Sequence, residues 1–249
     1  MIDDPAEWQW RSESRFIACP LRVEVGGEEG PHFTGGVPPH SRIACGQCGK
    51  PLTLLWDIDL TDPVLPWYLI KCFWPNKRLP LYICWQCVGA SYSVKSDTEI
   101  HCHSFDRSHE YCDEDETPFA DAPQILPRRP LKLTPVPSAV DGIVQLCKTL
   151  GWSRIDQDAR RILNSYLQMS VLRSDVSFSQ IGGSSRKYQG DRHAECPNPK
   201  CELNGQDESM RELAMIHWPE EPVLAHERFQ LVYMVCIHCF ALTGYYQCA

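Results

Sequence analysis

The chain has 249 residues, is 43% hydrophobic and carries a formal net charge of −8. That length can bury one large core or two modest ones, of which we expect two, and the absence of a run of about 18 apolar residues excludes a membrane-spanning helix. The negative charge disfavours nucleic acid as a partner and favours a basic protein.

The first five residues are acidic and lack the charged-then-apolar pattern of a secretion signal. We therefore expect a cytoplasmic protein. Thiols stay reduced in that compartment, so the 14 cysteines are better explained by metal binding than by disulfides.

Residues 1–44 are predicted to form a strand and glycine turns. Leu21–Val25 alternates apolar and polar side chains, which is the period of a half-buried strand. Gly26-Gly27 and Gly35-Gly36 follow and indicate turns before the first cysteine pair.

Two CxxC pairs come next, and their cysteines are Cys45, Cys48, Cys84 and Cys87. Four thiols that arrive as two separated pairs can close a tetrahedral shell around one zinc ion. Cys84 lies 36 residues after Cys48, which is longer than the spacing of a compact zinc ribbon, so the residues between must form structure of their own.

Those intervening residues have the pattern of strands. Apolar side chains occupy alternate positions over 52–60, with Leu55 as the exception, and a second strand-like run over 79–83 leads into the second pair. The alternatives for the cysteines are disulfides, a redox CxxC and unrelated buried thiols. A redox CxxC opens a helix, whereas Gly49 and Pro51 disfavour one.

A short strand is predicted over 91–94, and a group of histidines and cysteines follows it. Its members are His101, Cys102, His103, His109 and Cys112. They form either a further metal site or a solvated loop. We favour the loop, because their spacing fits no common metal site and the acidic run 113–116 follows.

Residues 117–137 hold six prolines, which disfavour a regular helix or a central strand, so we interpret them as a connector. A helical pair is predicted over 138–175, where Ser138 and Asp141 resemble a capping box. The apolar stripes expected to pack are Ile143, Leu146, Cys147 and Leu150 on the first helix and Ala159, Ile162, Leu163, Tyr166, Leu167 and Val171 on the second.

The final third of the chain repeats the first in outline. Gly182-Gly183 precedes a cysteine pair, a strand-like run over 213–218 and, 35 residues after Cys201, a CxxC pair. The second set of predicted metal ligands is Cys196, Cys201, Cys236 and Cys239. His193 or His238 are alternative ligands, although four thiolates already fill such a site.

These patterns predict an α+β, mainly β fold made of internally duplicated zinc-knuckle β units with a short helical pair between them. The expected divisions are residues 1–116 for the first zinc-bearing β unit, 117–137 for the connector, 138–175 for the helical pair and 176–249 for the second zinc-bearing β unit, with both units packed as one body. Two structural Zn²⁺ ions are expected, because four cysteines leave no open coordination position for a catalytic water.

No local catalytic motif is present. Gly182–Lys187 resembles a phosphate loop but does not match GxxxxGK[ST], and neither HExxH nor Gly-x-Ser-x-Gly occurs. We therefore expect no enzyme activity. Basic residues occur as scattered pairs such as Arg128-Arg129 and Arg160-Arg161 rather than as a stripe, so a nucleic-acid-binding zinc ribbon is only an alternative.

The repeat also carries a resemblance to a known family. A Gly-Gly pair before the first cysteines, a Leu-rich strand with an acidic end and a strand that runs into a second CxxC resemble the YwqG-like bacterial proteins, which are similar to the programmed cell death protein 2 and Tsr-four ribosome-assembly proteins. Gly35-Gly36-Val37-Pro38 keeps the start of that family's GGxPxW(I/L)Q motif, and 180–189 holds a diverged copy with Ser185 and Tyr188 near the expected Pro and Trp.

The resemblance implies a duplicated β-rich fold that binds protein segments as a chaperone does. We accordingly predict a zinc-stabilised, chaperone- or adaptor-like module that holds a basic protein client. The predicted client surface is an aromatic cleft with an acidic rim. The candidate side chains are Trp56, Trp67, Trp74, Trp85 and Trp218, and the alternative for each of them is core packing. The alternatives are an immunity protein that neutralises a bacterial toxin, a nucleic-acid-binding zinc ribbon and an enzyme without a local motif.

Overall fold

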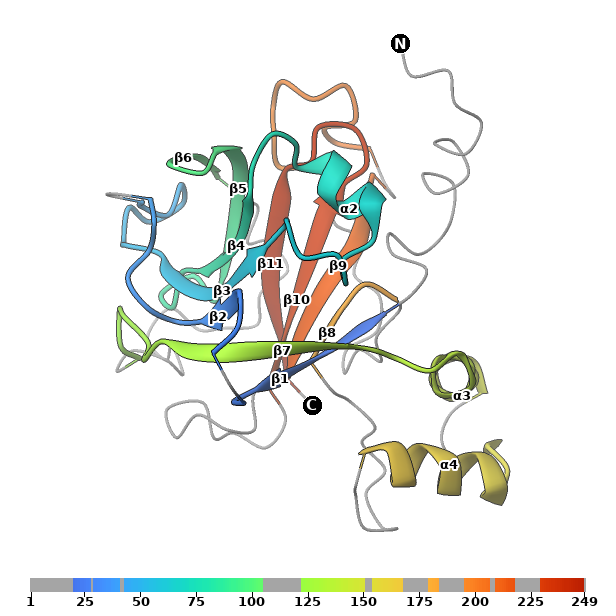
Figure 1. Ribbon diagram of the computed structural model, residues 1–249. Helices are drawn as coiled ribbons and strands as arrows, with labels where there is room; N and C mark the ends of the chain where they lie inside the picture. Colours follow the sequence, from blue (N-terminus) through green and yellow to red (C-terminus); the bar gives the residue numbers. More distant parts are fainter. Residues whose placement is uncertain are drawn as a thin grey trace.

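The computed structural model describes residues 20–27, 29–40, 43–104, 122–150, 154–167, 179–183, 195–206, 209–217 and 229–248. In these ranges 11 strands form one antiparallel sheet that curls into a half-barrel, accompanied by three short helices (Figure 1). The prediction of a mainly β fold with a helical pair is confirmed.

The elements of the first half are β1 (Leu21–Val25), β2 (His32–Thr34), β3 (Thr53–Asp59), α2 (Trp67–Cys72), β4 (Arg78–Ile83), β5 (Gly89–Ser96) and β6 (Glu99–His103). Those of the second half are β7 (Arg129–Pro135), α3 (Ser138–Leu150), α4 (Gln157–Leu167), β8 (Gln180–Ile181), β9 (Met210–His217), β10 (Phe229–Cys236) and β11 (Leu242–Cys248). Across the sheet the strands run in the order β4-β3-β2-β7-β1-β8-β9-β10-β11-β5-β6. One sheet therefore passes through both cysteine-bearing units.

The exception to the alternation over 52–60 is a β-bulge. Leu54 pairs with Tyr82 and Trp56 with Leu81, which leaves Leu55 without a partner in the β3–β4 ladder. A bulge lets Leu55 stay in the core, where its side chain is 0% exposed. The β9–β10 ladder has a bulge of the same kind, with Leu213 as the unpaired residue.

Each bulge receives a hydrogen bond from a Gly-Gly pair. The Gly35 amide donates to the Leu55 carbonyl at 2.9 Å, and the Gly182 amide donates to the Leu213 carbonyl at 2.7 Å. All the glycines of both pairs have positive φ, from 65° to 89°. A Cβ at Gly35 would collide with the backbone carbonyl of Pro127, so this turn needs glycine for space as well as for φ.

The expectation that residues 117–137 exclude a central strand is wrong for their last part. Strand β7 lies in the middle of the sheet and pairs with β1 on one side and β2 on the other. Pro135 is the last residue of the strand and Pro130 the second, so the prolines leave the middle of the strand free to pair. Leu131, between them, is buried in the main core.

The helical pair α3–α4 has a small core of its own, and Figure 1 shows it beyond one end of β7. Its buried residues are Val136, Val140, Ile143, Val144, Ile155, Ala159 and Leu163. The predicted stripes are right for Ile143, Ala159 and Leu163 but wrong for Leu146, Leu150 and Ile162, which are 44–49% exposed. Side chains of Cys147, Tyr166 and Leu167, and the whole of Val171, lie outside the described part.

Tyrosine hydroxyls occupy the outer edge of β4, the first strand of the sheet. Tyr92 on β5 accepts the Tyr82 amide at 3.0 Å and donates to the Pro80 carbonyl at 2.9 Å. Tyr233 on β10 donates to the Tyr82 carbonyl at 2.9 Å. Gly244 makes room for this, because a Cβ there would stand 2.6 Å from the Tyr233 ring. None of the described helices is long and apolar enough to cross a bilayer.

Candidate metal centres

The first cysteine group joins two loops of the sheet. Cys45 and Cys48 lie in the turn between β2 and β3, and Cys84 and Cys87 lie in the turn between β4 and β5. Their four Sγ atoms lie within 4.8 Å of one another. The Cys45 and Cys87 sulfurs are 3.7 Å apart, and those of Cys48 and Cys84 are 3.5 Å apart. Three of the four are buried and Cys48 is exposed.

Left-handed residues close the turns around these sulfurs. Gly49 and Val88, which follow the second cysteine of each pair, have φ values of 72° and 49°. The Gly49 amide then donates to the Cys45 carbonyl at 2.9 Å. Inside the same turn the Gln47 amide points at the Cys45 sulfur, 3.4 Å away. Such turns present a thiolate to a metal while backbone N–H groups stabilise its charge.

The second group repeats this arrangement on the other half of the sheet. Its members are Cys196, Cys201, Cys236 and Cys239, again with all Sγ atoms within 4.8 Å. The Cys196 sulfur lies 3.4 Å from that of Cys239, and the Cys201 sulfur lies 3.8 Å from that of Cys236. As in the first group, the first cysteine of the set faces the fourth, and the second faces the third. Phe240 follows the last cysteine with a φ of 57°.

The spacing of the sulfurs fits a tetrahedral metal site. Zinc–thiolate bonds of about 2.3 Å place the sulfurs of a tetrahedron about 3.8 Å apart. The facing sulfurs are 3.4–3.8 Å apart, close to that value and well beyond the roughly 2.05 Å of a disulfide. Each group could therefore hold a metal ion, and both are consistent with zinc sites.

The thiols of each group cannot all ionise unaided. Hydrogen bonds from neighbouring thiols lower the pKa of Cys45 to about 2, whereas a hydrogen bond with Cys45 raises the pKa of Cys84 far above its ordinary value and that of Cys87 to about 12. In the second group the pKa of Cys239 falls to about 4 while burial raises that of Cys196 to about 12. A divalent cation supplies the positive charge that four thiolates require.

His238 stands beside the second group and is not needed to complete it. Its Nδ1 lies 3.5 Å from the Cys201 sulfur, and its Nε2 lies 3.6 Å from a carboxylate oxygen of Glu202. A ring held between a ligand sulfur and a carboxylate orients the ligand from outside the coordination shell. His193 lies outside the described residues.

The residues around His101 do not form a third group where the structure describes them. His103 is buried, and its Nε2 lies 2.8 Å from the Ser93 hydroxyl, so the ring is part of the β5–β6 packing. Desolvation lowers the pKa of His103 to about 4. Cys102 faces the core beside β5, and His109 and Cys112 lie outside the described residues.

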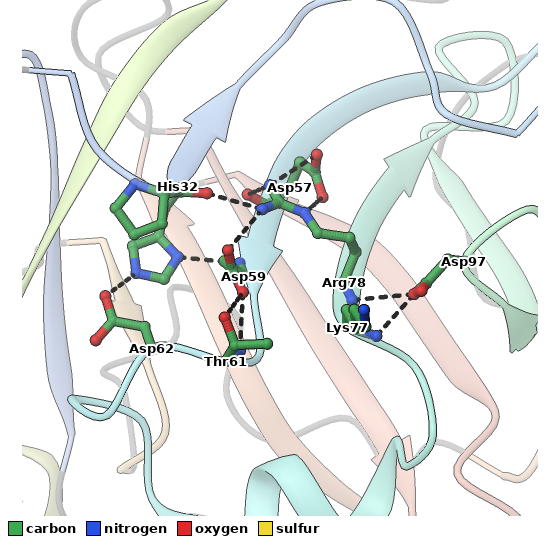
Figure 2. Close-up of polar contacts among 9 residues, drawn as sticks. His32, Asp57, Asp59, Thr61, Asp62, Lys77, Arg78 and Asp97 are labelled. Atoms are coloured by element: carbon green, nitrogen blue, oxygen red, sulfur yellow. Dashed lines mark hydrogen bonds and ion pairs between the residues drawn. The ribbon is translucent and has the colours of Figure 1, made fainter.

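Sequence reasoning missed a charged network on the outer part of β3 and β4 (Figure 2). Arg78 makes a two-pronged ion pair with Asp57, with Nε–Oδ1 and Nη2–Oδ2 distances of 2.9 and 2.8 Å. Its Nη1 also donates to the Pro31 carbonyl at 2.9 Å and lies 3.3 Å from Asp59. The alternating acids of the 52–60 strand were the available signal, but their partner Arg78 lies on the next strand.

His32 in the same network has both ring nitrogens engaged. The Asp59 amide donates to Nδ1 at 3.1 Å, so Nε2 carries the proton and donates to Asp62 at 2.9 Å (Figure 2). The ring is 2% exposed, and this burial lowers its pKa below the ordinary 6.5. A histidine with both nitrogens bonded inside the fold pins strands together and has no nitrogen free to serve as a general base.

Comparisons with protein-family models, with curated proteins and with solved structures returned no match. The likeness to the YwqG-like proteins accordingly stays a prediction that depends on the residues quoted for it. In the described part of the chain, the two cysteine groups are the features whose sulfur positions indicate a chemical role, which is metal binding.

Proposed function

We propose that each cysteine group binds one Zn²⁺ ion and that both ions are structural. Support comes from the closed set of four sulfurs in each group and from the tetrahedral spacing of those sulfurs. Structural zinc in small modules contributes apparent free energies of about 10–16 kcal/mol at neutral pH. Bound metal would thus hold together the turns at the ends of β4 and β10, where the cysteines are packed among buried side chains of the sheet.

We propose further that the protein is a non-enzymatic, chaperone- or adaptor-like module that holds a basic protein client. The observation that carries this is Trp74, whose side chain is 75% exposed just after helix α2. Its neighbour Phe73 is buried, with its ring 6.3 Å from that of Phe240, the residue after Cys239. The second metal centre therefore supports the loop that presents Trp74 to solvent.

An exposed tryptophan on a supported loop has the properties of a binding hot spot. Tryptophan is enriched at such positions because it buries a large apolar area at low entropic cost. The net charge of −8 favours a basic client. The same role follows from the resemblance to the chaperone-like family named above.

The aromatic cleft expected from the sequence is not formed by all of its proposed members. Trp56 and Trp85 are 1% and 4% exposed and belong to the main core, so their role is core packing and not client contact. The side chain of Trp67 and the whole of Trp218 lie outside what the structure describes. Trp74 is the member whose described side chain can reach a partner.

A capture experiment with matched variants tests this function. The wild-type chain, Trp74→Ala and Leu146→Ala are immobilised and exposed to lysate of the source cell at low and high salt. We expect a stoichiometric basic protein on the wild type and on Leu146→Ala, its loss from Trp74→Ala, and weaker retention at high salt. Equal capture by all three variants, or no stoichiometric partner on folded wild type, would contradict the proposal.

A further inference from the structure

The order of strands in the sheet is nearly symmetric about its centre, because equivalent strands of the two halves lie at matching distances from the β7–β1 pair. The predicted division into two units does not explain this symmetry. Reading outward from the central pair, β7-β2-β3-β4 on one side matches β1-β8-β9-β10 on the other. In each direction the first strand comes from the opposite half of the chain. Strand β1 pairs with β8 of the second half, and β7 pairs with β2 of the first.

The register between β1 and β7 has two-fold symmetry. Thr34 and Ile181 each precede a Gly-Gly pair, and their partners are Arg129 and Leu21, so Arg129 and Leu21 occupy equivalent places. Three positions further along each strand are Glu24 and Lys132. These two residues pair with each other in the β1–β7 ladder, which places a two-fold axis between them.

A second pair of equivalent residues meets on the far side of the sheet. Ser91 and Thr243 each lie four residues beyond the last cysteine of their group. They are partners in the β5–β11 ladder, and their hydroxyl oxygens are 3.0 Å apart. Contact between a residue and its own equivalent is the mark of a two-fold, self-complementary interface.

The two halves also match inside each unit, although their side chains differ. Both carry the Gly-Gly hydrogen bond to a bulge leucine described above. The Asp59 amide is accepted by the His32 ring, and the equivalent His217 amide is accepted by the Ser179 hydroxyl at 2.9 Å. The backbone pattern is therefore shared where the sequence has changed.

We propose that this chain is a strand-exchanged two-fold dimer fused into one polypeptide, in which each metal-bearing unit is completed by a strand from the other. The interaction surface between the two units is formed by β1 and β7. Strand β1 pairs with the second unit, and β7 pairs with the first. Val23 shows the exchange directly, because its amide donates to the Ser179 carbonyl of the second unit at 2.8 Å. Val23 and Leu131 are 5% and 3% exposed, and both belong to the main core, to which both halves contribute side chains.

Exchange makes a crossed prediction for point variants in the donated strands. Val23→Ala in β1 should raise the hydrogen-exchange rates of β8 and β9 amides roughly tenfold or more, with less effect on β2 and β3. Leu131→Ala in β7 should do the reverse, although β7 belongs to the second half of the chain. The readout is hydrogen exchange with peptide-level mass analysis on the full-length, metal-loaded chain.

Two self-contained units would give the opposite pattern. Val23→Ala would then loosen β2 and β3, and Leu131→Ala would loosen β8 and β9; that result, or equal effects on both units, overturns the proposal. As a second measurement, a protease site is inserted in a flexible linker between residues 116 and 117 and cut under native conditions. The proposal requires the two fragments to stay together as one species, and their separation into two folded, zinc-bearing pieces contradicts it.

Discussion

At the scale of single residues, two glycines with similar positive φ angles have different surroundings. Gly35 and Gly49 have φ values of 65° and 72°. A Cβ at Gly49 meets no atom within 4 Å, whereas one at Gly35 meets the Pro127 carbonyl and Leu126. Conformation and space can therefore be tested separately.

We predict that Gly49→Ala lowers the free energy of unfolding by about 1–2 kcal/mol, the cost of a left-handed alanine. Gly35→Ala adds to this an overpacking cost of about 1–3 kcal/mol. Denaturant titration of the zinc-loaded proteins measures both. Equal losses in the two variants would show that the Gly35 turn is not held against residues 126–127.

His32 predicts a pH dependence of stability. Burial lowers its pKa in the folded chain, so above about pH 6.5 the ring is neutral in both states and contributes no pH dependence. Below that pH the His32 ring binds a proton in the unfolded chain but stays neutral in the folded chain. The free energy of unfolding therefore falls as the pH falls from about 6.5 toward the lowered pKa.

We predict that His32→Asn makes this decline shallower. The asparagine amide oxygen takes the place of Nδ1 and accepts the Asp59 amide, but the side chain does not titrate. Stability is measured between about pH 7 and 5.5, with metal content checked at each pH. His101→Asn, on an exposed ring, is the control, and a slope unchanged by His32→Asn would show that burial of this ring does not couple to folding.

At the scale of elements, β4 ends the sheet with tyrosine hydroxyls in place of a neighbouring strand. Tyr92 satisfies two backbone groups of β4, and Tyr233 satisfies one. Because each buried group left without a partner costs about 1–3 kcal/mol, Tyr92→Phe should destabilise the protein about twice as much as Tyr233→Phe. Thermal unfolding of the two variants tests this, and the opposite ranking would mean that water or movement of β4 replaces the Tyr92 hydroxyl.

The elements that sequence could predict are those with a clear local period. Alternation over 21–25 and 52–60 identified β1 and β3, the strand-like run over 79–83 identified β4, and the spacing of cysteines identified both groups of sulfurs. Local pattern failed where distant contacts decide the structure. Strand β7 forms because β1 and β2 flank it and its prolines lie at or near its ends, and Leu55 keeps its place through a bulge.

The candidate site shows the same division. The spacing of the cysteines predicts both groups of metal ligands. The Arg78 network depends on the register between β3 and β4, which the sequence alone does not predict. Helix α3 presents Leu146 and Leu150 to solvent because its described packing is confined to α4 and the adjoining strand end, which cover only one side of its apolar face. A helical period predicts that a helix has an apolar face but not how much of that face is covered.

At the scale of the whole molecule, the two cysteine groups fasten turns of one continuous sheet. Strands β1 and β7 join the halves through the centre, and β5 and β11 join them again on the far side. Metal bound at either group therefore stabilises a structure that both halves share. We expect zinc removal by a strong chelator to unfold both halves in one transition, as followed by hydrogen exchange in β3 and β9.

The most direct test of the account is the metal content of protein purified without added zinc. Mass is measured under native conditions and again after acid denaturation, alongside alkylation of the folded protein. We predict two zinc ions per chain, both lost on denaturation, with the eight ligand cysteines protected from alkylation until then. A folded protein that holds no metal and whose cysteines alkylate freely would contradict the structural role given to both groups.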